Sequence, residues 1–150
     1  GLRRSGRSIR AASFLRTMKT TKIRQRVRFD ATPLKVYHAL MSSRTHSAFT
    51  GLTARIATKV GGKISVFDGY GSGVNLKLER GKRIVQTWKP IEEGWPEDHF
   101  SEVEFRLKAK GSGCELDFIH RKIPATLKKQ FADGWCRYYW EPMKAMFERG

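Results

Sequence analysis

The chain has 150 residues, of which 39% are hydrophobic, and this is enough for one domain with a buried core. Thirty Lys and Arg against fourteen Asp and Glu give a formal charge of +16, which favours acidic proteins, nucleic acid or anionic membranes as partners. No apolar run approaches the roughly 18 residues that span a bilayer, and two cysteines are too few for a disulfide framework, so we expect a cytoplasmic protein without a membrane span.

The first 17 residues are set apart by their charge. Residues 1–17 contain five arginines and no acid, so this basic leader carries +5 of the total. Its Arg- and Ser-rich composition is typical of organelle transit peptides, whereas the alternative is a vector-derived tag, a scar or a misassigned start, because Met18 stands before the first strand pattern. We expect 1–17 to be disordered in either case, 18–150 to form a single domain, and import into an organelle if the leader is native.

The first regular pattern lies at residues 22–29, where polar and apolar residues alternate and predict a half-buried strand. Four cations occupy its outer face and are called the basic stripe: Lys22, Arg24, Arg26 and Arg28. The basic stripe either binds an acidic partner or pairs with acidic side chains of a neighbouring strand.

The next segments predict two short helices and a strand meander. Thr32 is suited to an N-cap and Pro33 to the first helical turn, so we expect helices over 34–41 and 44–49, the second ended by Gly51. Strand patterns follow at residues 53–57, 64–67, 74–78, 83–88, 103–109 and 114–118. A loop over 90–98 contains Trp95, and the acids of the last strand are candidate partners for the basic stripe.

The last segment, residues 124–148, predicts a helix about 36 Å long. Its apolar residues recur every three to four positions: Leu127, Phe131, Trp135, Tyr138, Pro142 and Met146. Pro142 should kink the last turns, and Gly134 lowers the helix propensity. An antiparallel sheet that buries one apolar face against this helix gives an α+β domain, and strong curvature of the sheet would leave a cavity between the two.

Candidate catalytic residues are few. His38, His46, His99 and His120 are isolated, without the Cys or carboxylate spacing of a metal site. His120 either points into the cavity or is a hydrogen-bonded structural histidine. The glycine-rich residues 69–73 lack a following helix, so they indicate a turn and not a phosphate-binding loop. We therefore predict no enzyme activity, no metal and no cofactor.

Two binding sites are predicted. The first is the space between sheet and helix, and its expected lining is Trp88, Phe105, Phe118, Phe131, Trp135 and Tyr138. These rings either surround a small apolar ligand or fill the space as core. The second site combines Trp95 with the basic stripe and would hold an acidic protein, unless Trp95 folds back over the cavity mouth.

Several runs of the sequence resemble one known family. Residues 61–69, 84–88, 94–97, 99–100 and 134–144 with Phe147 are similar to the C-terminal domain of the activator of heat-shock protein 90 ATPase. The resemblance covers about residues 20–150. It implies the START-like, helix-grip fold, in which a curved antiparallel sheet of about six or seven strands wraps a long C-terminal helix, with two short helices after the first strand.

The resemblance also implies a function. It predicts a stress-response co-chaperone that docks on the N-terminal nucleotide domains of heat-shock protein 90 and favours their closed, ATP-hydrolysing arrangement. In eukaryotic members a separate N-terminal domain binds the chaperone's middle segment, whereas these 150 residues match only the later domain.

Two other functions stay open. One is a carrier of a small hydrophobic ligand in the cavity, and the other, nucleic-acid binding, rests on charge alone without a motif. We expect a monomer whose partner is heat-shock protein 90 or a small apolar ligand, and no specific nucleic acid.

Overall fold

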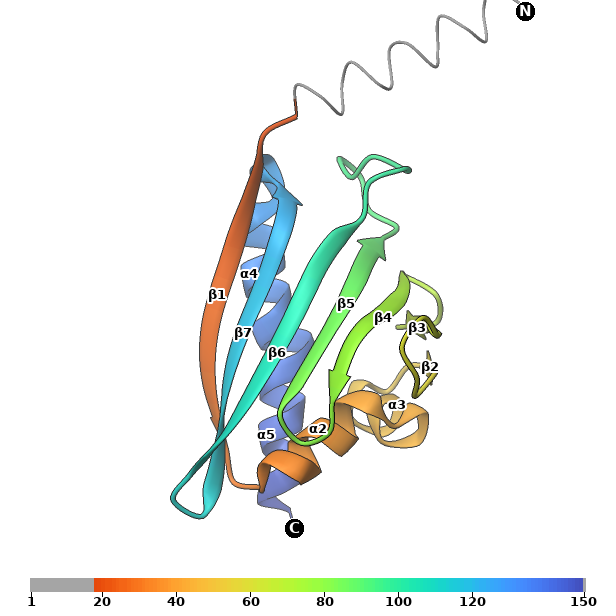
Figure 1. The fold of residues 1–150 in the computed structure, drawn as a ribbon. Coiled ribbons are helices and arrows are strands. Elements are labelled where there is room, and N and C mark those ends of the chain that lie inside the picture. Colours follow the sequence, from red (N-terminus) through yellow and green to blue (C-terminus); the bar gives the residue numbers. More distant parts are fainter. Residues whose placement is uncertain (1–17, 150) are drawn as a thin grey trace, which may run out of the picture.

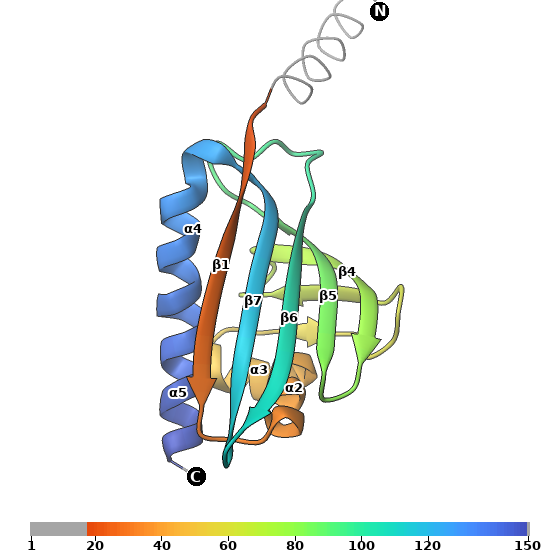
Figure 2. The ribbon, with the colours of Figure 1, turned by 60° about the vertical axis from the view of Figure 1, so that its left-hand side comes forward.

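A curved sheet wraps one side of a long C-terminal helix in the computed structural model, which describes residues 18–149 (Figures 1 and 2). The seven antiparallel strands are β1 (Thr20–Phe29), β2 (Arg55–Ile56), β3 (Lys63–Val66), β4 (Gly71–Glu79), β5 (Arg83–Pro90), β6 (Ser101–Lys110) and β7 (Gly113–Pro124). Their order in the sheet is β1-β7-β6-β5-β4-β3-β2, so the first and last strands of the chain are neighbours. The predicted α+β, helix-grip architecture is confirmed, while the expectation for residues 1–17 lies outside the described residues.

The two helices after the first strand begin and end at the predicted signals. The Thr32 hydroxyl accepts a hydrogen bond of 3.3 Å from the Lys35 N–H and caps α2 (Pro33–Met41). The next helix, α3 (Ser43–Thr50), ends at Gly51, whose φ of +79° is a left-handed conformation that glycine adopts without steric cost. Together they close one end of the sheet, as Figure 2 shows.

The pairing of β1 with β7 is set by charge on one face and by packing on the other. On the outer face, Arg24 binds Asp117 of β7 with two nitrogens, at 2.8 and 3.1 Å, which confirms the predicted cross-strand pairing. On the inner face, Gln25 donates to the Ala132 carbonyl at 3.0 Å and accepts from the Trp140 indole at 2.7 Å. Gln25 therefore joins the edge strand to the C-terminal helix.

Strand β4 starts earlier than its pattern suggests. Residues 69–73 are expected to form a turn, but Gly71 and Gly73 lie in β4. A Cβ on Gly73 would stand 1.8 Å from the Thr87 carbonyl oxygen of β5, so only glycine permits this close approach. The ladder between β4 and β5 shifts register between Asn75 and Lys77, and such a bulge bends a sheet.

The C-terminal helix contains a change of winding. It runs through a 3₁₀ turn (Ala125–Leu127), α4 (Lys128–Trp135), a π turn (Cys136–Trp140) and α5 (Glu141–Glu148). The π turn ends two residues before Pro142, which has no N–H to donate and whose ring displaces the carbonyl four residues earlier. The predicted effect of Pro142 on the last turns coincides with this change of winding. No described helix is long and apolar enough to cross a bilayer.

The extra residue of the π turn changes which side chains face the sheet. Regular helical spacing places Tyr138 on the buried face, but Tyr138 is 54% exposed. Tyr139, Trp140 and Met143 are buried instead, at 5% exposure or less. The predicted stripe is therefore correct up to Trp135 and wrong at Tyr138.

Candidate functional site

The space between sheet and helix is filled by aromatic rings. Five of the six predicted lining residues are less than 7% exposed there: Trp88, Phe105, Phe118, Phe131 and Trp135. The Phe118 and Trp135 ring centroids are 4.4 Å apart, and those of Trp88 and Trp135 are 5.4 Å apart. The remaining internal void has a volume of about 10 Å³, which is room for at most one water molecule. Phe105 and Phe118 therefore act as core in this structure.

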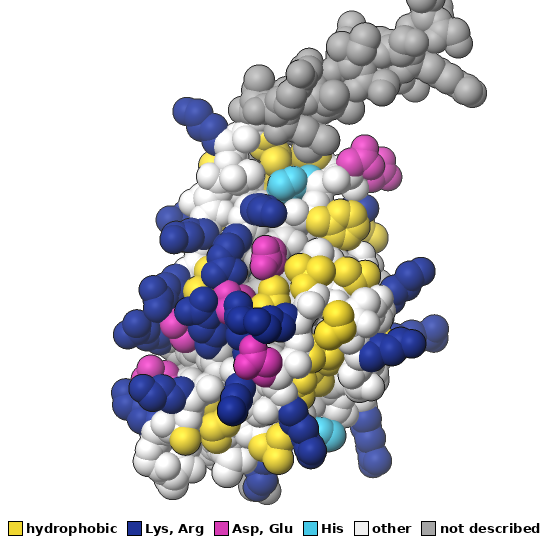
Figure 3. All heavy atoms as spheres, in the orientation of Figure 1, with side chains coloured by type: hydrophobic (Ala, Val, Ile, Leu, Met, Phe, Trp, Pro, Cys, Tyr) yellow, Lys and Arg dark blue, Asp and Glu magenta, His cyan; other side chains and the backbone are white. Residues whose placement is uncertain are grey.

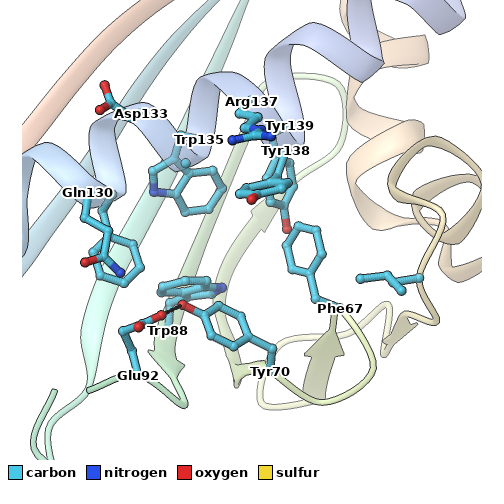
Figure 4. Close-up of a pocket in the computed structure, with 13 residues that line it drawn as sticks. Phe67, Tyr70, Trp88, Glu92, Gln130, Asp133, Trp135, Arg137, Tyr138 and Tyr139 are labelled. Atoms are coloured by element: carbon cyan, nitrogen blue, oxygen red, sulfur yellow. Dashed lines mark hydrogen bonds between the residues drawn. The ribbon is translucent and has the colours of Figure 1, made fainter. Parts of the chain in front are cut away.

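An open groove lies on the flank of this packed layer. Its volume is about 650 Å³, and its walls come from the helix on one side and from the β3–β4 turn, β5 and the following loop on the other (Figure 4). Its aromatic walls are Phe67, Tyr70, Trp88, Phe131, Trp135, Tyr138 and Tyr139. Four predicted lining residues thus border it, and their role in ligand binding stays a prediction. Phe67 and Tyr70 were missed, because they lie in a turn that has no periodicity.

Two features of the helix keep the groove open. Gly134 borders it without a side chain, and a Cβ at this position would meet nothing nearer than the Tyr138 ring at 3.9 Å. The π turn directs Tyr138 outward to the groove rim and not into the core. A glycine and a π turn both weaken a helix, and departures from regular winding often mark functional sites.

The rim of the groove carries opposite charges. On the sheet side, the Tyr70 hydroxyl donates a hydrogen bond of 2.5 Å to Glu92, and Figure 4 shows this pair below the Trp88 ring. Burial, and then the Glu92 carboxylate, raise the pKa of the Tyr70 phenol. On the helix side, the Arg137 guanidinium lies 5.7 Å from the centre of the Tyr138 ring. The groove can therefore accept an apolar body with polar ends.

His120 is held in the core by a hydrogen-bond chain. The Trp135 indole, which only donates, reaches His120 Nδ1 at 3.0 Å, so the neutral ring carries its proton on Nε2. Nε2 donates to the Ser101 hydroxyl at 2.8 Å, and this hydroxyl donates to the Trp88 carbonyl at 2.5 Å. Burial lowers the pKa of His120 to about 3.

The hydrogen-bonded pair of Ser101 and His120 does not act as a catalytic nucleophile with a general base. Ser101 is 1% exposed and His120 is 0% exposed, so no substrate reaches the hydroxyl. A histidine with so low a pKa is also a weak general base at neutral pH. His120 is the structural histidine of the two predicted alternatives. The described residues likewise hold no group of three or more His, Cys, Asp or Glu arranged for a metal.

Trp95 is buried at the end of the core. It is 7% exposed, its indole donates to the His99 carbonyl at 2.8 Å, and its ring lies 5.4 Å from that of Phe131. Trp95 therefore folds back onto the core, as in the second of the two alternatives, and its contribution to a partner surface stays a prediction. The physical reason is the large apolar area of an indole, whose burial stabilises the fold.

The outer face of the sheet is open to solvent and basic (Figure 3). Strands β1, β6 and β7 place eight cations there, namely Lys22, Arg24, Arg26, Arg28, Arg106, Lys108, Lys110 and Arg121, and four acids, namely Glu102, Glu104, Glu115 and Asp117.

The basic stripe on β1 is only partly engaged. Arg24 pairs with Asp117, and Arg28 donates to the Lys110 carbonyl at 3.0 Å. Lys22 and Arg26 make no ion pair within residues 18–149, so these two are the members of the basic stripe that remain available.

Comparisons with known proteins agree with this architecture. The human protein named activator of 90 kDa heat shock protein ATPase homolog 1 is 33% identical over 131 residues, which are 87% of this chain and 38% of that protein. An HSP90 activator from Plasmodium falciparum has the same fold, with a TM-score of 0.77 and 22% identity over 83% of this chain and 94% of the other. A solution structure called the Aha1 dimer, from Colwellia psychrerythraea, has a TM-score of 0.71 and 21% identity, and the match covers 85% of this chain and 96% of the other.

The chain thus spans well under half of its human relative. The family described as Activator of Hsp90 ATPase homolog 1-like protein matches residues 30–148, and the chain belongs to this family.

Proposed function

We propose that this domain is a non-catalytic co-chaperone that binds heat-shock protein 90 and stimulates its ATPase. The observation that carries the proposal is the family match over residues 30–148, since the human relative is named for this activity. The uncovered basic face supplies a surface for a protein partner, with Lys22 and Arg26 free of ion pairs among the described residues. Because the domain can shift the chaperone only by its differential affinity, it must bind the ATP-hydrolysing arrangement more tightly than the others.

The test is an ATPase assay of heat-shock protein 90 from the same organism, at moderate salt, with and without this protein. Reversing Lys22 and Arg26 to Glu should reduce the stimulation at least about fivefold, because like charges then replace attraction at the interface. The matched control reverses Lys128 and Lys144, two exposed cations of the C-terminal helix, and should keep the stimulation. Absence of stimulation and of binding by the unaltered protein would remove the proposal for this domain.

The groove supports a second candidate function, the binding of a small apolar ligand. The specific observation is the open space of about 650 Å³ at Gly134, where the aromatic walls leave room that a side chain would occupy. Gly134→Met should abolish binding of an apolar fluorescent dye, while Gly134→Ala should retain most of it. Both variants should leave the ATPase stimulation unchanged, so the two candidate functions are separable. Equal dye binding by all three proteins would exclude the groove as the ligand site.

A further inference from the structure

One buried carboxylate on the outer face of the sheet binds three arginines. Glu104 of β6 is 1% exposed although it points away from the core, because arginine side chains cover it. Its Oε2 accepts from the Nε of Arg83 and of Arg106, each at 2.7 Å. Its Oε1 accepts from a terminal nitrogen of Arg121, also at 2.7 Å. The three arginines come from β5, β6 and β7, and we call this group the arginine triad.

The arginine triad exceeds what the stability of the sheet requires. Glu104 and, at 3.8 Å from Arg83, Glu79 supply two carboxylates against three guanidinium groups, so the group keeps a net positive charge. Arg83 and Arg106 are direct cross-strand partners, an arrangement that like charges normally oppose. The side chains of Arg83, Arg106 and Arg121 are 32%, 49% and 33% exposed, so they still face solvent.

Glu104 fixes these arginines in position before any partner arrives. Arg83 and Arg106 each use Nε on Glu104, which leaves both terminal nitrogens of each directed elsewhere, although one terminal nitrogen of Arg83 also lies 3.8 Å from Glu79. A guanidinium can bind a second carboxylate through its two terminal nitrogens. Since these arginine side chains are already ordered, they lose little further rotamer entropy when a partner binds.

The arginine triad continues a row of charges across four strands. In the sheet register, Arg26 of β1 stands opposite Asp117 of β7, which stands opposite Arg106, and Arg106 stands opposite Arg83. With neighbouring strands about 4.8 Å apart, this row spans about 14 Å. Arg24 already binds Asp117 with two nitrogens, so the one acid of the row is occupied. An extended peptide of about five residues covers the same length.

We propose that the arginine triad, together with Arg26, is a docking surface for an acidic segment of a partner protein. Charge complementarity favours carboxylate side chains, which fit the free guanidinium forks in pairs. Single-stranded nucleic acid fits less well, because it binds through exposed aromatic rings as well as charge. Of the two exposed aromatic residues of the described chain, Tyr138 lies on the helix, and Phe100 lies in the β5–β6 loop, where the Lys89 ammonium is 5.4 Å from the centre of its ring.

The experiment measures binding of a fluorescein-labelled decapeptide of alternating Glu and Ser by fluorescence anisotropy. The double variant Arg106→Gln/Arg121→Gln should weaken binding at least about tenfold, because it removes two guanidinium groups that Glu104 holds in place. The matched control Lys108→Gln/Lys110→Gln lowers the net charge equally on the same face and should change the affinity less than about threefold. Equal losses in both double variants would reduce the surface to general charge attraction and overturn the proposal.

Two further variants separate the roles of the fork and of its anchor, and the first also guards against a folding artefact. Arg106→Lys keeps the charge and a donor for Glu104 but loses the fork, and should weaken binding about threefold to tenfold in a protein with native thermal unfolding. Glu104→Gln raises the net charge by one, yet it should weaken binding because the arginines lose their anchor. Tighter binding by Glu104→Gln would overturn the proposal. The proposal would also be overturned if a mixed-sequence oligonucleotide displaced the peptide and its own affinity fell by the same factor in Arg106→Gln/Arg121→Gln.

The inference does not depend on the identity of the partner. Peptide binding that follows the expected pattern, without stimulation of the chaperone ATPase, would keep the docking surface and remove heat-shock protein 90 as its partner. Stimulation that is indifferent to the arginine triad, together with no peptide binding, would keep the proposed function and remove the docking surface.

Discussion

Two buried histidines should make this fold sensitive to mild acid. His46 is 2% exposed, and its Nε2 shares a hydrogen bond of 2.8 Å with the Tyr139 hydroxyl, while its Nδ1 has no hydrogen-bond partner among residues 18–149. His120 is 0% exposed, and its Nδ1 accepts from Trp135 and cannot take a proton without losing that bond. Burial lowers the pKa of His46 from 6.5 to about 4 and that of His120 to about 3.

The direction in which the free energy of unfolding changes with pH follows from the lowered pKa values of the two histidines. Below pH 6.5 the unfolded chain takes up protons on both rings while the folded protein does not, so the free energy of unfolding falls as the pH falls. The loss continues until the pH reaches the folded-state pKa of each ring. At pH 5 each histidine has lowered the free energy of unfolding by about 2 kcal/mol, and the two together by about 4 kcal/mol. The total for a domain is about 5–15 kcal/mol.

The assay is urea unfolding followed by tryptophan fluorescence at pH 7.5, 6 and 5. His46→Gln keeps an amide near the Tyr139 hydroxyl and should reduce the loss between pH 7.5 and 5 by about half, or about 2 kcal/mol. The control His38→Gln alters an exposed residue of α2 and should leave the loss as it is. An unchanged loss in His46→Gln would refute the assignment of acid sensitivity to the buried rings.

Three further substitutions test other parts of the structure. Burial alone would raise the pKa of Glu104, but its arginine hydrogen bonds outweigh burial and lower it to about 2. Glu104→Gln should therefore lower the free energy of unfolding by up to about 3 kcal/mol at pH 7, and urea titrations should show this deficit shrinking below pH 4.5, where the contribution is lost. Trp95→Ala should cost about 3–5 kcal/mol in thermal unfolding, whereas a partner-facing tryptophan would leave stability unchanged. Gly134→Ala should raise the free energy of unfolding in urea by about 1 kcal/mol, since its Cβ meets no clash, and a lower free energy would contradict the open groove.

Local patterns predicted the elements well because each depends on a few neighbouring residues. Alternation over 22–29 predicted β1 and its basic outer face, and the Thr32 cap and the Gly51 end follow from backbone chemistry within one turn. The pairing of Arg24 with Asp117 was predictable as well, because the first and last strands offered complementary outer faces.

The misses arise where a distant contact or a change of winding decides the outcome. A count of 3.6 residues per turn places Tyr138 inside, and the π turn adds one residue and brings Tyr139 inside instead. Gly73 lies in a strand because the Thr87 backbone of β5 approaches it, which no local pattern reveals. In the arginine triad, Arg121 is 17 positions and Arg83 is 21 positions from Glu104 in the sequence, and the group spans three strands. Only the register of the sheet brings these residues together.

The same register connects the core to the outer surface. Glu104 alternates along β6 with Val103 and Phe105, which are buried against the helix, and Val103 stands opposite His120 of β7. The position of the Glu104 carboxylate is thus set by packing behind it, which is why three exposed guanidinium groups can be held in place on a solvent-facing sheet. Loss of this packing in acid should release the arginine triad together with the core. Peptide binding should then be lost at the pH where acid unfolds the protein, and His46→Gln should move both transitions together toward lower pH.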